Sequence, residues 1–319
     1  EISACLVGSE MCIRDRKCTV NKNITLYAVQ KKAVQLTFHR CDGSTWQKTT
    51  LAKGSSYSLP GVRDAEGYTF MGWSTKPMQS VSPQYEAEEK ITVNGNVDLY
   101  AVVFNRTTET DLTEDQLPQV DIYKYKQVIF VGDSRTEFME NVLTGMGESA
   151  TKNVKFVCSA GKGLDWFTTT GWAQLYSIVQ HDSNSILSKK TAVIFNFGVN
   201  DLSKSADYAE YYNWIAPQLK SKGCELYFMS VNPVNRLMLP NAGRADRSEA
   251  AVRSFNQYMK ANLSSAYTYI DMYSYLKSTG YSFASDHYGT GTVDDGLHYT
   301  TRTYKRIFAK CMDSLRVPA

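Results

Sequence analysis

The sequence predicts an α/β domain, a doubly wound parallel five-stranded sheet with helices on both faces, preceded by a small β-rich repeat domain. After residue 126, short apolar runs alternate with helical patterns. Several of these runs are almost continuously apolar, which is typical of parallel strands buried on both faces. The β-rich domain is predicted from an internal repeat, because residues 19–29 recur as residues 92–102, and such recurrence indicates copies of one supersecondary unit.

The α/β domain, expected over residues 127–319, should hold its binding site at one edge of the sheet. In such sheets ligands bind at the carboxyl ends of the strands. Residues 105–126 are polar, acidic and without periodicity, so they predict a linker to the preceding domain. The predicted strands are 127–131, 154–157, 192–197, 225–230 and 267–270, and the clearest predicted helices are 207–222, 246–263 and 300–315.

The β-rich repeat domain is expected over residues 31–104. Its β-type runs are separated by Gly and Pro turns, and a strand at 97–104 ends the pattern. Residues 68–74 (Tyr-Thr-Phe-Met-Gly-Trp-Ser) and 99–102 (Leu-Tyr-Ala-Val) resemble the Listeria–Bacteroides, or internalin B-repeat, module. The resemblance implies a β-rich spacer on an extracellular bacterial protein, with residues 17–30 as the tail of a truncated copy.

The start of the chain does not have the pattern of a folded segment. Residues 10–15 (Glu-Met-Cys-Ile-Arg-Asp) can be encoded by the end of a widely used sequencing-transposon adapter. We therefore expect residues 1–16 to be a translated read-end artefact, which is excluded from fold reasoning; a genuine leader is the alternative. No signal-peptide pattern occurs there, and we expect the signal peptide to be missing from this N-terminus.

Composition argues against several classes of partner. The net charge of +3 is too small to indicate nucleic acid or an anionic membrane surface. No apolar run reaches the length of a membrane span. The cysteines show no metal-ligand spacing, so neither a metal site nor a disulfide framework is expected. The oligomeric state is left open.

Four short segments supply the groups that acyl transfer by a serine nucleophile needs. Each follows a predicted strand or precedes the last helix. Each alone has a structural explanation, such as a helix N-cap for the serine or turn chemistry for an Asn-Asp pair; their joint occurrence in this order indicates catalysis. The segments are Gly132-Asp133-Ser134, Ser159-Ala160-Gly161-Lys162-Gly163, Gly198-Val199-Asn200-Asp201 and Asp295-Gly296-Leu297-His298.

Ser134 is the candidate nucleophile. It stands at a strand-to-helix turn, where its backbone N–H is unpaired and can also donate to an oxyanion. The side chain of Asn200 is a second candidate donor to the oxyanion. The third is the backbone N–H of Gly163, for which Gly161 is the alternative, because a glycine lets a ligand oxygen approach closely.

His298 is the candidate general base, and Asp295 is its candidate partner in the predicted loop before the last helix. A carboxylate that accepts the Nδ1 proton fixes the tautomer and leaves Nε2 to take the serine proton. The neighbouring Asp294 competes for this role with a less suitable spacing.

These segments resemble the sequence blocks of the SGNH/GDSL hydrolase family, over roughly residues 127–316. The resemblance implies a flavodoxin-like SGNH fold and a serine esterase that needs neither metal nor organic cofactor. It also implies the roles given above: Ser134 as nucleophile, Gly163 and Asn200 as oxyanion donors, His298 as base and Asp295 as its partner.

The substrate is predicted from residues near the predicted strand ends. Arg135, Trp166 and Asn232 would form a polar, aromatic-lined mouth, which suits an acylated sugar better than a long fatty chain. With the surface-type repeat, this predicts an extracellular or cell-surface bacterial esterase that removes short acyl groups, foremost O-acetyl, from a carbohydrate or cell-wall glycan. The alternatives are a lipolytic or thioester hydrolase, or a catalytically silent glycan-binding surface protein.

Overall fold

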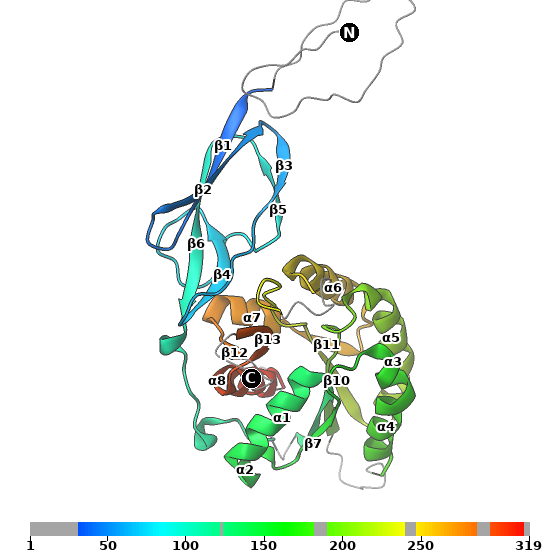
Figure 1. Cartoon of the computed structure of the whole chain (residues 1–319). Coiled ribbons are helices and arrows are strands. Elements are labelled where there is room, and N and C mark those ends of the chain that lie inside the picture. Colours follow the sequence, from blue (N-terminus) through cyan, green and yellow to red (C-terminus); the bar gives the residue numbers. More distant parts are fainter. Residues whose placement is uncertain (1–30, 122–123, 182–189, 240–246, 286–293, 316–319) are drawn as a thin grey trace, which may run out of the picture.

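The chain folds into a β-rich part followed by an α/β part, in the predicted order (Figure 1). The computed structural model describes residues 31–121, 124–181, 190–239, 247–285 and 294–315. The two predicted segments 1–16 and 17–30 lie outside these described residues. No helix in the described ranges is both long and apolar enough to cross a bilayer.

The β-rich domain has a small core of its own. Its strands are β1 (Ala33–His39), β2 (Thr45–Ala52), β3 (Ser55–Ser58), β4 (Tyr68–Ser74), β5 (Lys90–Val93) and β6 (Val97–Asn105). Four strands form a sheet in the order β2-β1-β6-β4, and β3 pairs with β5. Because side chains alternate along a strand, Leu36 and Phe38 of β1 face the same core as Trp73 of β4. The predicted strand at 97–104 is confirmed as β6.

The α/β domain is built on a five-stranded, fully parallel sheet, as predicted. Its strands are β7 (Tyr125–Gly132), β8 (Val154–Cys158), β9 (Lys190–Asn196), β10 (Cys224–Met229) and β11 (Tyr267–Ile270). The strand order is β11-β10-β9-β7-β8, with every pair parallel. The chain therefore runs from β7 to β8 and then returns to the other side of β7, which is the flavodoxin-like order.

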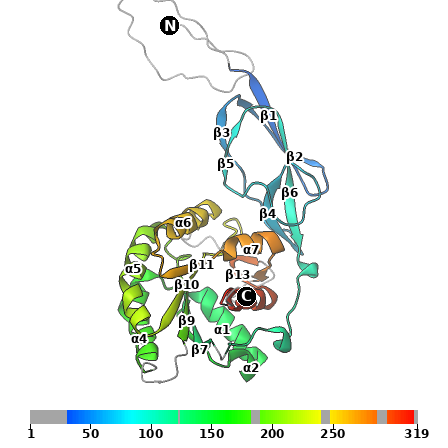
Figure 2. The ribbon, with the colours of Figure 1, turned by 180° about the vertical axis from the view of Figure 1, so that it is seen from behind.

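Helices cover both faces of this sheet, as the two opposite views show (Figures 1 and 2). Those with described bounds are α1 (Ser134–Met146), α2 (Glu148–Thr151), α3 (Leu164–Trp166), α4 (Trp172–His181), α5 (Ser205–Ser221), α6 (Glu249–Asn262), α7 (Met272–Thr279) and α8 (Thr301–Ser314). On β7, Ile129 and Val131 pack with α4, α5 and α6, whereas Val128 and Phe130 pack with α1, α7 and α8. Burial on both faces explains why the strand sequences are almost continuously apolar.

A short hairpin lies outside the central sheet and corrects one expectation. Strands β12 (Phe283–Ser285) and β13 (Asp294–Tyr299) pair only with each other within the described chain, in antiparallel fashion. Residues 295–298, predicted as a loop, therefore belong to a strand. Period-2 alternation is not visible in Asp-Asp-Gly-Leu-His-Tyr, so the sequence carries no strand pattern there.

The segment predicted as a linker is packed against the α/β domain where the structure describes it. It contains two single-turn 3₁₀ helices, η1 (Arg106–Thr108) and η2 (Glu114–Gln116). Its Leu117 and Val120 join the buried cluster around β7 and α8. A polar stretch with two isolated apolar residues gives no periodic signal, so this packing was not predictable from pattern alone.

Candidate active site

Three of the four predicted segments follow neighbouring strands at one edge of the sheet. Gly132 at the end of β7 is paired in register with Cys158 of β8 and with Asn196 of β9. The segments that follow these strands therefore begin side by side. The strand order reverses between β7 and β9, and such a switch point is where doubly wound sheets bind ligands.

Ser134 is the first residue of α1 and directly follows β7. The side chain of Asp133 caps the helix by accepting a hydrogen bond from the Arg135 N–H at 3.0 Å. A Cβ on Gly132 would lie 2.0 Å from the Thr136 hydroxyl, so only glycine lets the helix start this close to the strand. The Gly-Asp-Ser sequence thus places the hydroxyl at the sheet edge, only 6% exposed.

A continuous hydrogen-bonded chain joins Ser134, His298 and Asp295. The Ser134 Oγ lies 2.9 Å from His298 Nε2, and His298 Nδ1 lies 2.5 Å from Asp295 Oδ2. Because a carboxylate can only accept, Nδ1 carries the proton and Nε2 accepts from the serine hydroxyl. The edge of the imidazole contacts the Phe138 ring, with centroids 4.7 Å apart. The arrangement gives the serine a base whose tautomer is set by the carboxylate.

The Asp295 carboxylate is held in place by the local backbone. Its Oδ1 accepts hydrogen bonds from the N–H groups of Leu297 and His298, at 2.8 and 2.7 Å. Burial raises the pKa of Asp295, but the hydrogen bond from His298 and these N–H groups together hold the pKa below its ordinary value. The Gly296 backbone is left-handed, with φ +66°, and a Cβ there would lie 2.4 Å from the Asn235 carbonyl oxygen. Glycine is therefore required for this tight turn.

The two predicted oxyanion segments are joined to each other. The Asn200 amide donates to the Lys162 carbonyl at 2.7 Å, and its side-chain oxygen accepts from Arg247. The Asp201 carboxylate accepts from the Leu164 N–H at 2.9 Å. Both contacts tie the loop after β9 to the loop after β8. They position the residues predicted to donate to an oxyanion.

The two candidate glycines of the second segment differ in their surroundings. Gly161 has φ +69° and open space around its Cβ position, so it serves a left-handed turn. A Cβ on Gly163 would lie 2.3 Å from the Asp201 carboxylate, so this glycine is required for close approach of the β9 loop. These surroundings favour Gly163 as the residue with a functional constraint, and its role as a donor stays a prediction.

Two of the three residues predicted to bind substrate lie in the interior, and their contact with substrate stays a prediction. Arg135 is 2% exposed and donates to the carbonyls of Leu297, Asn232 and Pro233, each at 3.0 Å. It therefore ties α1 to the loop after β10 and to β13. Asn232 is also buried. Trp166 is half-buried against Phe197, and substrate contact by its exposed edge stays a prediction.

Three further polar residues were not assigned from the sequence. Asp133 and Asp201 stand inside the predicted segments, so their place beside the site could have been suspected from those motifs. Arg247, which contacts Asn200, lies at the start of the helix predicted at 246–263, and no motif there indicated that it reaches the site. Across the described ranges, no group of His, Cys, Asp and Glu side chains could hold a metal ion.

We expect Asp133→Asn to stabilise the protein at alkaline pH. Burial raises the pKa of Asp133 to about 6 from an ordinary 3.8. The protonated Asp133 side chain therefore stabilises the fold fully below pH 3.8. This stabilisation is lost as the pH rises through about 6, where the buried carboxyl group ionises. Asparagine also caps helices and carries no charge. The variant should gain roughly 1–3 kcal/mol of unfolding free energy over wild type at pH 8, and little at pH 4.

Urea unfolding of both proteins at pH 4 and pH 8 measures this difference. A variant that is less stable than wild type at pH 8 would contradict the prediction.

Comparison with known proteins places the chain in a family. Residues 128–311 match the model of the GDSL-like lipase/acylhydrolase family, which is more than half of the chain. The chain belongs to this family. Residues 35–102 match the Listeria-Bacteroides repeat domain, so both predicted resemblances are confirmed. A search of curated proteins found no significant sequence match to this GDSL-family hydrolase.

Several solved structures align with 60–63% of this GDSL-family chain. A protein from Bacteroides fragilis that is described as an acylhydrolase is 16% identical to this chain. The TM-score is 0.42, and the alignment covers 63% of this chain and 92% of the Bacteroides chain. An acetyl xylan esterase is 11% identical, with a TM-score of 0.39 over 60% and 100%. The catalytic domain of Streptococcus pneumoniae peptidoglycan O-acetyltransferase A is 15% identical, with a TM-score of 0.36 over 60% and 92%.

Proposed function

We propose that this GDSL-family acylhydrolase is a secreted bacterial serine esterase that removes short acyl groups, foremost acetyl, from a carbohydrate or cell-wall glycan. The observation that carries the reaction type is the hydrogen-bonded chain Ser134–His298–Asp295 at the carboxyl edge of the sheet. Such a chain is what a neutral serine needs in order to attack a carbonyl.

In the proposed reaction, His298 Nε2 takes the hydroxyl proton while Ser134 Oγ attacks the ester carbonyl. The resulting oxyanion is stabilised by the N–H groups of Ser134 and Gly163 and by the amide of Asn200. His298 then gives the proton to the departing alcohol, which leaves an acyl-enzyme. A water molecule, deprotonated by His298, attacks the acyl-enzyme and releases the acid and free Ser134.

A groove of about 650 Å³ lies next to the Phe138 ring that contacts the His298 imidazole. Its lining combines polar groups, such as Asn141 and Thr301, with the apolar side chains of Val142 and Met146. The preference for a sugar ester is therefore proposed from the repeat domain rather than from this groove. The bacterial surface location is proposed from the Listeria-Bacteroides repeat domain.

Hydrolysis of nitrophenyl acetate, butyrate and octanoate tests the acyl preference. We expect kcat/KM for acetate to exceed that for octanoate by about 10-fold or more, since each methylene is worth about 1–3 kcal/mol of discrimination. Acetate release from acetylated xylan and from O-acetylated peptidoglycan then distinguishes the glycans. A preference for octanoate would support the lipolytic alternative. No turnover and no labelling by a fluorophosphonate would support the silent glycan-binding alternative.

A further inference from the structure

The strand that carries Asp295 and His298 is not held by the central sheet. Within the described chain, β13 pairs only with β12, at Phe283–Tyr299 and Ser285–Asp294. The five parallel strands that position Ser134 therefore do not position its base through backbone pairing. Something else must hold the hairpin against α1 to within a fraction of an ångström, because catalytic geometry is sensitive to such shifts.

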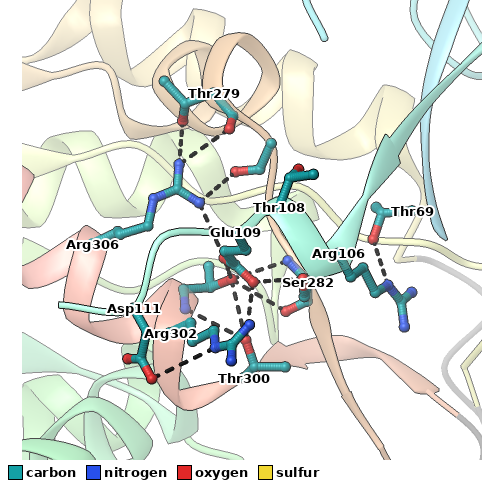
Figure 3. Close-up of polar contacts among 12 residues, drawn as sticks. Thr69, Arg106, Thr108, Glu109, Asp111, Thr279, Ser282, Thr300, Arg302 and Arg306 are labelled. Atoms are coloured by element: carbon teal, nitrogen blue, oxygen red, sulfur yellow. Dashed lines mark hydrogen bonds and ion pairs between the residues drawn. The ribbon is translucent and has the colours of Figure 1, made fainter. Parts of the chain in front are cut away.

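One set of contacts comes from Glu109, in the segment that links the two domains (Figure 3). Its carboxylate is 5% exposed and accepts hydrogen bonds from the hydroxyls of Ser282, at 2.6 Å, and Thr303. Ser282 directly precedes β12, and Thr300, which directly follows β13, donates to the same carboxylate at 3.5 Å. One side chain from outside the α/β domain thus bonds both residues that flank the open end of the hairpin.

The charge of Glu109 is balanced by the α/β domain itself. Arg306 of α8 lies 3.0 Å from the carboxylate and also donates to the Gly280 carbonyl and the Thr279 hydroxyl (Figure 3). This buried ion pair is costly to separate, because each partner would be left as an unpaired buried charge if it moved. We call Glu109, Ser282, Thr300, Thr303 and Arg306 the Glu109 cluster.

A second set of contacts reaches the hairpin from the repeat domain. The Asn235 backbone N–H donates to the Gly296 carbonyl at 2.8 Å, between Asp295 and His298 in the chain. The Asn235 side-chain amide donates to Asp64 Oδ1 at 2.9 Å and to the Val62 carbonyl at 3.0 Å. The repeat domain therefore fixes the Asn235 side chain, and the Asn235 backbone in turn bonds the turn after Asp295.

The repeat domain is itself fixed to the α/β domain by a buried interface. The Phe104 ring lies against Gly280, where a Cβ would come within 2.2 Å of it. Lys277 of α7 is buried and lies 2.7 Å from Glu86 of the repeat domain and 3.2 Å from Glu249. Contacts of this kind are not expected of a spacer joined by a flexible tether.

We infer that Glu109 and Asn235 are positioning residues for His298 and Asp295, so that the repeat domain and the segment after it are part of the catalytic unit. The inference rests on the proposed function, since it assigns those two residues to catalysis. Loss of either set of contacts should let the hairpin move relative to Ser134, while the α1 side of the groove, lined by Phe138, Asn141 and Val142, stays in place. The effect should therefore fall mainly on kcat.

The test compares Glu109→Ala, Glu109→Gln and Asn235→Ala with Asp111→Asn in the full chain. Asp111 is the matched control, because it joins the same segment to α8 through Arg302 and Lys305, is half-exposed, and does not touch the hairpin. We expect kcat for nitrophenyl acetate to fall about 10- to 100-fold in Glu109→Ala and Asn235→Ala, with KM within about two-fold. Glu109→Gln, which keeps one acceptor oxygen and loses the charge, should be intermediate, and the control should match wild type.

A proton NMR signal of His298 Nδ1–H provides a readout that needs no substrate. A proton held between imidazole and carboxylate at 2.5 Å gives a far-downfield resonance. We expect this resonance in wild type and Asp111→Asn, and its loss or upfield shift in Glu109→Ala and Asn235→Ala. Should Glu109→Ala fail to fold, Asn235→Ala decides alone.

The outcomes separate this inference from the proposed function. An inactive wild type would overturn the proposed function, while the NMR comparison would still decide whether the hairpin depends on Glu109 and Asn235. Folded variants with unchanged kcat and an unchanged resonance would overturn the inference and leave the proposed function standing. A lower unfolding midpoint with normal kcat would likewise overturn it, because it would reveal a purely structural role.

Discussion

Ser134→Ala is expected to lower kcat for nitrophenyl acetate by about 10⁴- to 10⁶-fold. The hydroxyl is the atom that attacks the ester in the proposed reaction, and alanine leaves only substrate binding and the oxyanion donors. The fold should be unaffected, because among the described residues the hydrogen bond of this hydroxyl is to the catalytic candidate His298, at 2.9 Å from its Nε2. Steady-state kinetics and thermal unfolding of the purified variant measure both expectations.

Ser149→Ala is the matched control for this substitution. Ser149 lies on α2, is exposed, and is outside the four candidate segments. It should retain wild-type kcat and wild-type labelling by a fluorophosphonate. Labelling that persists in Ser134→Ala and vanishes in another serine variant would reassign the nucleophile.

Asp295→Asn is expected to lower kcat/KM by about 10³- to 10⁴-fold. The asparagine amide can donate to Nδ1, which stabilises the tautomer with the proton on Nε2 and prevents it from accepting the serine proton. The pKa of Asp295 lies below its ordinary 3.8, so the carboxylate is ionised at neutral pH. Its contribution to stability is present above pH 3.8 and is lost as the pH falls below that value.

Asp294→Asn tests the competing assignment, since Asp294 is the adjacent carboxylate that the sequence left as an alternative. We expect this variant to keep wild-type kcat/KM, because Asp295 is the residue within 2.5 Å of His298. Kinetics of the two variants side by side settle the role. A large loss in Asp294→Asn together with normal activity in Asp295→Asn would reverse the assignment.

The sheet and its helices were predictable because their signals are local. The runs at 127–131 and 154–157 are apolar over the whole length of a strand, and both faces of the sheet are in fact covered. The helix expected at 246–263 begins with a Ser248 cap and appears as α6, Glu249–Asn262. The hairpin strand β13 was missed, since its sequence alternates neither in polarity nor in size.

The interior position of Arg135 shows a different limit. An arginine beside a catalytic serine indicates an anion or substrate contact when the sequence is considered alone. Its three acceptors, the carbonyls of Leu297, Asn232 and Pro233, are backbone atoms far along the chain. Every residue has a backbone carbonyl, so the sequence does not indicate which carbonyls accept hydrogen bonds from Arg135. The burial of its guanidinium group could therefore be seen only in the folded structure.

The sequence by itself determined the order of the elements and the candidate residues for the chemistry, because hydrophobic periodicity and short motifs are properties of neighbouring residues. It placed Ser134 and Asn200 after strands that a doubly wound sheet brings together, and His298 before the last helix. Only the tertiary structure decided how the base is held. The contact between Glu109 and Arg306 joins residues far apart in the chain, in a segment whose polarity predicted a linker. The Glu109 carboxylate is buried and paired by residues far along the chain, and no local sequence pattern encodes these contacts.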